Sequence, residues 1–259
     1  MQRRAPEAEG TMRERGATGG AGADKAPRAK SNDTIRREAG ARAERQMAFY
    51  LHRAFTGDAG IHALNDLRIV DPVQPEVDGR PGVAQIDHLI VHPWGLVIIE
   101  SKSVHDQVTV RADGSGGDEW TRRVRRREHG FPSPIRQAER QAAFLRQFLQ
   151  RHREQLLGRM AVGLRTLSRL VHGTDQRSFA QMPIQIVVAI SDGGTIRRSG
   201  GWTEPSTPFR SFVTKADLVA DKIREEIGKH REGDRLPTSV KIVAAFSGSR
   251  SVARLRQCH

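Results

Sequence analysis

The stretch at residues 84–102, AQIDHLIVHPWGLVIIESK, limits the possible fold more than any other part of the chain. Two runs of β-branched and aliphatic residues, Ile86–Val91 and Leu96–Ile99, flank a Pro-Trp-Gly segment with the chemistry of a tight turn. Nearly continuous apolar strands are typical of sheets that are covered on both faces. The stretch therefore predicts a β-hairpin that is covered on both faces.

Three charged residues interrupt this hairpin, namely Asp87, Glu100 and Lys102. A two-residue loop places Asp87 opposite Glu100 and Gln85 opposite Lys102, whereas a bulge at Gly95 would shift the register by one. Facing Cβ atoms lie about 4.5–5.5 Å apart, so both carboxylates can hold one hard divalent cation. Oxygen ligands suit Mg²⁺ or Mn²⁺, and a nearby lysine can orient or deprotonate a water on the metal.

A simpler interpretation is a salt-bridged strand end, in which Lys102 neutralises both carboxylates without any chemistry. A Glu-x-Lys sequence alone is compatible with that. An aspartate 13 residues earlier, on the facing strand of an apolar hairpin, is a much rarer coincidence and favours the metal site.

The hairpin resembles the central block of the nuclease-related domain (NERD) family. The resemblance rests on Gln85-Ile-Asp-His-Leu89, Pro93-Trp-Gly95 and Ile98-Ile-Glu-Ser-Lys102. That family is similar to the PD-(D/E)XK nucleases, which implies a restriction-endonuclease-like mixed β-sheet flanked by helices and metal-dependent phosphodiester cleavage. The resemblance implies that Asp87 and Glu100 are metal ligands and that Lys102 positions the attacking water.

Glu44 is a further candidate for the site. It lies in a helix predicted from Asn32 or Asp33 to about Phe55, at the edge of the apolar face, so we expect its carboxylate to be at least partly buried. The segment from residues 43 to 48 resembles the family pattern G-E-x-x-[VA]-A, although the glycine is missing. The alternative is an exposed glutamate paired with Arg45 or Arg53.

Gln137 is a second candidate. Ser133-Pro134 predicts the N-cap and first residue of a helix that ends near Arg151, with Gln137 in its first turn. Ser133-Pro-Ile-Arg-Gln137 resembles the family segment N-P-x-x-Q, which implies that Gln137 faces the site. The alternative is an exposed glutamine.

The charge of the chain indicates a polyanionic partner. The net charge is +13, and nucleic acid is the polyanion that such an excess favours. Five arginines lie within six positions and are candidates for phosphate contacts, the alternative being a solvated edge. They are Arg122, Arg123, Arg125, Arg126 and Arg127.

Other features exclude several classes of protein. The single cysteine, Cys258, rules out a disulfide framework and an internal zinc cluster. We find no apolar run long enough to span a membrane and no signal sequence, so we expect a cytoplasmic protein without a membrane partner.

The predicted organisation is a disordered, basic and glycine-rich tail at 1–32, a nuclease-related domain at 33–235, and a C-terminal extension at 236–259. Strands are expected at His62–Val70, Gln107–Arg111, Glu119–Val124, Pro183–Ile190 and Phe212–Val213, and a further helix at Leu156–Val171.

The predicted function is that of a Mg²⁺-dependent (or Mn²⁺-dependent) nuclease that hydrolyses phosphodiester bonds, with DNA as the expected nucleic acid and DNA processing as its role. The alternative is a catalytically silent module that binds nucleic acid on a nuclease fold.

Overall fold

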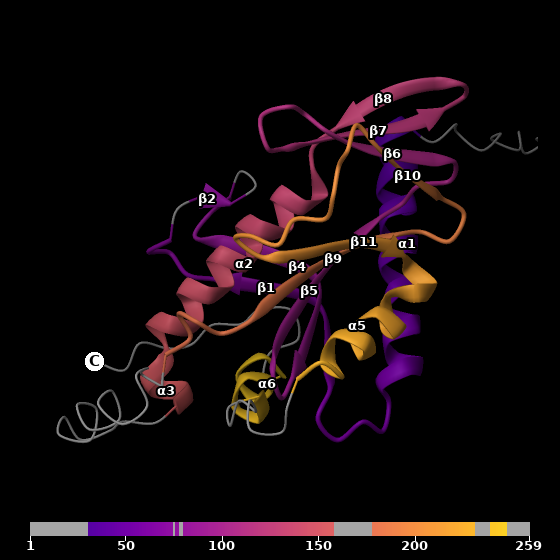
Figure 1. Cartoon of the computed structure of the whole chain (residues 1–259). Coiled ribbons are helices and arrows are strands. Elements are labelled where there is room, and N and C mark those ends of the chain that lie inside the picture. The colour runs from indigo at the N-terminus through magenta and orange to yellow at the C-terminus, as the bar shows by residue number, and fades with distance from the viewer. Residues whose placement is uncertain (1–30, 75, 78–79, 158–177, 231–238, 248–259) are drawn as a thin grey trace, which may run out of the picture.

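The computed structural model describes residues 31–74, 76–77, 80–157, 178–230 and 239–247. A five-stranded sheet crosses the molecule in the strand order β1-β4-β5-β9-β11 (Figure 1). Neighbouring strands are antiparallel from β1 to β5 and parallel from β5 to β11. The predicted α/β class with a mixed sheet is confirmed. The strands are β1 (His62–Val70), β4 (Val83–His92), β5 (Gly95–Lys102), β9 (Ile184–Ile190) and β11 (Arg210–Lys215).

The hairpin of β4 and β5 lies in the middle of this sheet and has the predicted two-residue loop. His92 pairs with Gly95 and His88 with Ile99, so Gly95 does not form a bulge. Gly95 has a φ of 156°, and a Cβ there would lie 2.5 Å from the carbonyl oxygen of Pro183. Only glycine fits this close approach.

Helices cover both faces of the sheet, which explains why the hairpin strands are apolar on both faces. On one face pack α2 (Pro134–Arg151), α3 (Arg153–Leu157) and α6 (Ser239–Ser247), and on the other α1 (Asn32–Phe55) and α5 (Val219–Ile227) (Figure 1). Along β5, Leu96 and Ile98 pack in the core on the side of α2, α3 and α6. Val97 and Ile99 alternate with them and pack in the core on the side of α1 and α5.

The segment expected as a C-terminal extension contributes to the main core. Ile242 and Phe246 of α6 are buried in the cluster that also contains Phe148 of α2. The predicted domain limits stay a prediction.

A second, four-stranded sheet stands at one end of the first. Its order is β10-β6-β7-β8, with β6 (Gln107–Ala112), β7 (Asp118–Val124), β8 (Arg127–Phe131) and β10 (Thr195–Ser199). Trp120 of β7 is 1% exposed and packs with Val108, Ile135 and Val188. The two predicted strands of this sheet, β6 and β7, are confirmed.

The sequence did not indicate β8 or β10. Arg125 and Arg126 form the two-residue turn between β7 and β8, with φ angles of 49° and 67°. Such turns favour Asn-Gly, so an Arg-Arg pair gives no turn signal. β10 is a short strand of five residues, and the chain that follows it, from 200 to 209, has no strand or helix.

The loop from Asp71 to Gly82 begins with a buried carboxylate. The Asp71 carboxylate accepts a hydrogen bond from Gln74 and lies 3.3 Å from the Arg151 guanidinium. The loop also holds β2 (Glu76–Val77) and β3 (Arg80–Pro81). Thr214 lies in β11, and η1 (Ala216–Leu218) begins without a side-chain cap.

The predicted disordered tail lies outside the described residues, apart from its last two positions. There the Ser31 hydroxyl accepts a hydrogen bond from the Thr34 backbone N–H, so Ser31 rather than Asn32 or Asp33 caps α1. Most of the helix expected at Leu156–Val171 also lies outside the described residues. None of the described helices is both long and apolar enough to cross a membrane.

Candidate active site

The predicted triad lies where β4 and β5 separate. The ladder between the strands ends at the pair His88–Ile99, so the expected ladder pairs of Asp87 with Glu100 and of Gln85 with Lys102 do not form. Instead, the backbone N–H of Ser101 donates a hydrogen bond of 2.9 Å to the Asp87 carboxylate. This separation opens the end of the hairpin and leaves Asp87 half-buried at the surface of the sheet.

A distortion in the neighbouring strand accompanies the position of Asp87. On β1, Asp66 has a left-handed φ of 51°, between the ladder pairs Asn65–His88 and Leu67–Ile86. On β4, Ile86 and Leu89 contact the same core although they are three residues apart, so the strand's alternation changes at Asp87. Left-handed backbone is uncommon for a residue other than glycine.

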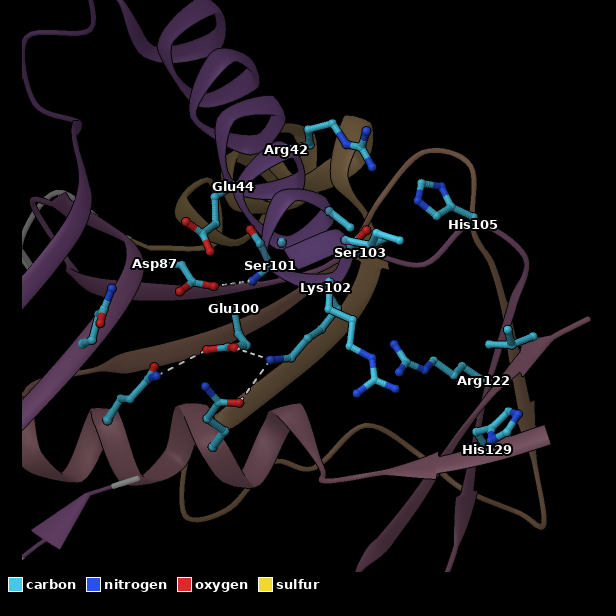
Figure 2. A pocket seen from close by; sticks show the side chains of 18 of the residues that line it. Arg42, Glu44, Asp87, Glu100, Ser101, Lys102, Ser103, His105, Arg122 and His129 are labelled. Carbon is cyan, nitrogen blue, oxygen red and sulfur yellow. Dashed lines mark hydrogen bonds and ion pairs between the residues drawn. The ribbon is translucent and has the colours of Figure 1, made fainter. Parts of the chain in front are cut away.

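Glu100 and Lys102 are held together by contacts with α2. The Lys102 ammonium lies 2.5 Å from one oxygen of the buried Glu100 carboxylate and donates a hydrogen bond of 3.1 Å to the Gln137 side-chain oxygen. The other Glu100 oxygen accepts a hydrogen bond of 3.3 Å from Gln141 (Figure 2). Gln137 therefore lies beside the triad.

Gln141 was missed by sequence reasoning. It is 1% exposed, and its side-chain oxygen is buried without a hydrogen-bond partner among the described residues. It follows Gln137 by four residues, so both lie on the same face of α2. The four-residue spacing from Gln137 is the sequence feature that could have identified Gln141.

Glu44 lies on α1 and lines the same groove as the triad, with its carboxylate directed toward Asp87 (Figure 2). Its side chain is exposed, although partial burial, followed by the negative charges of Asp87 and Asp66, raises the pKa of Glu44 above its ordinary value. The sequence predicted a carboxylate that is at least partly buried; the Glu44 side chain is exposed, and its carboxylate is directed toward Asp87.

Burial and like charge control the protonation of Asp87. Removal from water, and then the negative charge of Glu100, raise the pKa of the Asp87 carboxyl well above its ordinary value. The N–H of Ser101 and the charge of Lys102 oppose that shift. The carboxylate pair is thus incompletely neutralised by the protein.

His88 and His92, on the same strand as Asp87, are both buried. The ring of His88 is hydrogen-bonded to Asn65, and the ring of His92 accepts a hydrogen bond from the Trp94 backbone N–H.

The donor set fits a hard divalent cation that retains much of its water. Asp87 and Glu100 supply oxygen ligands, and the side-chain oxygens of Ser101 and Gln141 nearby are buried without partners among the described residues. Within the described part of the chain, no group of three or more His, Cys, Asp or Glu residues is arranged to hold a metal. Mg²⁺ is commonly bound by one or two carboxylates together with waters and phosphates, so two carboxylates suffice.

The five predicted arginines do not all lie at the site. Arg122 lines the groove, and its guanidinium lies 5.9 Å from the centre of the Phe131 ring. The other four are exposed on the β7–β8 hairpin and do not line the groove. They are Arg123, Arg125, Arg126 and Arg127.

The groove has a volume of about 1080 Å³ and extends beyond the triad. Its floor holds the acidic residues, and its walls come from the N-terminal half of α1 and from β7 and β8. Arg36 and Arg42 on α1 line it, and sequence reasoning did not identify them.

Comparison with known proteins supports the resemblance seen in the hairpin. The sequence model of the nuclease-related domain (NERD) family matches residues 39–174, which is more than half of the chain and includes Glu44, the triad and Gln137. Comparison with curated proteins and with solved structures gave no significant match. On the strength of the family match, the chain belongs to the nuclease-related domain family.

Proposed function

We propose that this protein is a metal-dependent nuclease that hydrolyses phosphodiester bonds in DNA and takes part in DNA processing. The observation that carries the proposal is the convergence of Asp87, Glu100 and Lys102 in one open groove, in a chain of the nuclease-related domain family. A structural ion pair alone would not require an adjacent groove with basic walls.

Asp87 and Glu100 would hold Mg²⁺ or Mn²⁺. When bound, the cation would supply positive charge for the phosphate and lower the pKa of a water molecule. The raised pKa of Asp87 supports this assignment, because a desolvated carboxyl beside another carboxylate gains most from a cation.

Lys102 is proposed to contact the phosphate and to orient the attacking water. Its side chain is 26% exposed and lines the groove, whereas the side chain of its partner Glu100 is 2% exposed, so Lys102 contacts both the carboxylate and the groove. Gln137 positions the ammonium through its hydrogen bond, and Gln141 orients Glu100 in the same way. Glu44, on the opposite wall, is proposed to accept a proton or to hold a water near Asp87.

A second candidate function is binding of nucleic acid without cleavage. One observation favours it: Lys102 and Gln141 already contact the two oxygens of Glu100. These contacts take up part of the acceptor capacity of the Glu100 carboxylate and reduce the negative charge that a cation would meet.

An assay of cleavage separates the two functions. The purified protein is incubated with labelled DNA and RNA, each single- and double-stranded, in Mg²⁺, Mn²⁺ or EDTA. We expect cleaved DNA with either cation and intact DNA in EDTA. Binding of DNA with no cleavage in either cation would support the silent module instead.

A further inference from the structure

We infer that the groove receives base-paired DNA and holds it through the phosphate backbone, without stacking of unpaired bases. The inference rests on the proposed function for its nucleic-acid substrate, but its support comes from the walls of the groove.

The first support is the position of every aromatic residue. The chain has three Trp, one Tyr and nine Phe, and all of them lie in described segments. Phe49, 59% exposed, is the only aromatic among the exposed large hydrophobic residues, and it does not line the groove. Proteins that bind single strands stack bases on aromatic side chains. The lining of this groove contains no Phe, Tyr or Trp for that purpose.

The half-buried aromatic residues are engaged elsewhere. The Trp94 ring stacks on His230 with centroids 6.1 Å apart, and Phe131 packs on Trp120 with centroids 5.8 Å apart. The Tyr50 hydroxyl donates a hydrogen bond to Asp192. None of these rings lines the groove.

The second support is that positive groups stand on both walls, on either side of the acidic floor. Arg36 and Arg42 are exposed on the α1 wall. On the other wall, Arg122 faces His129 across the β7–β8 ladder. Phosphates on both sides of a scissile bond can therefore be contacted at once, as a continuous backbone requires.

Arg36 on the α1 wall is available to an anion. Its guanidinium lies 4.0 Å from the Asp33 carboxylate, and both side chains are more than 70% exposed, which makes a weak ion pair.

Equilibrium binding in EDTA tests the inference without cleavage. The probes are a fluorescent duplex of about 20 base pairs and each of its separate strands. We expect the duplex to bind at least about tenfold more tightly than either strand, because one stacked base is worth about 1–3 kcal/mol in single-strand binders and no Phe, Tyr or Trp lines the groove. Equal or tighter binding of the single strands would overturn the inference.

Paired variants locate the contact. Arg36→Ala combined with Arg42→Ala should lower the steepness of log K against log salt for the duplex by about 2, since each phosphate contact contributes about 0.9. The control, Arg37→Ala combined with Arg53→Ala, removes the same charge from exposed positions of α1 outside the groove and should change the slope little. Equal effects of both pairs would refute the assignment of the α1 wall.

A variant that adds a positive charge gives a test that a folding defect cannot explain, because it is expected to bind more tightly. Ile35 lines the groove and is 48% exposed, so Ile35→Lys adds a cation to the same wall. We expect tighter duplex binding and a steeper salt slope; an unchanged slope would count against the inference. Preferential duplex binding by a protein that never cleaves would uphold this inference and refute the proposed nuclease activity, so the two can fail separately.

Discussion

Replacing His92 with asparagine should make the fold less sensitive to acid. His92 ends β4, is 4% exposed, and its Nδ1 accepts a hydrogen bond of 3.3 Å from the Trp94 backbone N–H. Burial, and then the positive charge of His230, lower the pKa of His92 from 6.5 to about 4. The folded state therefore favours the neutral ring.

The sign and size of the effect follow from this depressed pKa. The unfolded chain takes up a proton near pH 6.5 and the folded protein only near pH 4, so the contribution to stability is complete above pH 6.5 and is lost as the pH falls toward 4. One pKa unit corresponds to about 1.4 kcal/mol, so His92 alone should reduce the free energy of unfolding by about 2 kcal/mol between pH 6.5 and pH 5.

Urea unfolding at pH 7, 6 and 5, in EDTA, measures this loss. The side-chain oxygen of asparagine can accept the Trp94 hydrogen bond without titrating, so the His92→Asn protein should lose about 2 kcal/mol less than the wild type over this range. Part of the acid sensitivity should remain, because burial also lowers the pKa of His88 to about 4. His52→Asn, which removes an exposed ring, is the control. Parallel curves for the wild type and His92→Asn would refute the reasoning.

Four further variants test the site and the arginine hairpin. Asp87→Asn should raise the free energy of unfolding in EDTA by about 1–2 kcal/mol, because it removes a desolvated carboxyl from a repelling pair; a loss of stability would argue against that repulsion. Lys102→Arg should retain DNA binding and lose most turnover, and near-normal cleavage would limit this lysine to charge balance. Gln141→Leu should lower kcat about tenfold, equivalent to about 1.4 kcal/mol, with unchanged duplex affinity; an altered affinity with normal kcat would contradict its positioning role. Arg125→Asn with Arg126→Gly keeps the turn chemistry and removes two charges, so a flatter salt slope would indicate phosphate contacts and an unchanged slope a solvated edge.

The hairpin could be predicted because its information is local. The turn at Pro93-Trp94 fixes the register, the apolar runs on either side require cover on both faces, and charges in such strands need a partner. The first residue of α2 could be predicted for the same reason, because Ser133 caps the helix and Pro134 fits its first position.

Features that depend on packing between distant segments could not be predicted. Gln141 has no role until α2 lies across the end of β5, and Arg36 and Arg42 become one wall of a groove only when α1 faces the β7–β8 hairpin. The separation of the strands at Asp87 accompanies a left-handed residue on a third strand, Asp66, which sequence periodicity does not reveal.

Single-turnover cleavage of a labelled DNA duplex by the wild-type protein and by Asp87→Asn, across a titration of Mg²⁺, tests the central claim most directly. The asparagine can keep the hydrogen bond from Ser101 and loses only the charge that is proposed to hold the cation. We predict a rate that rises with Mg²⁺ for the wild type and a rate reduced by at least about a thousandfold for the variant, as expected when an essential catalytic group is removed. Equal rates in the two proteins, or cleavage by the wild type in EDTA, would contradict the assignment of Asp87 to a catalytic metal site.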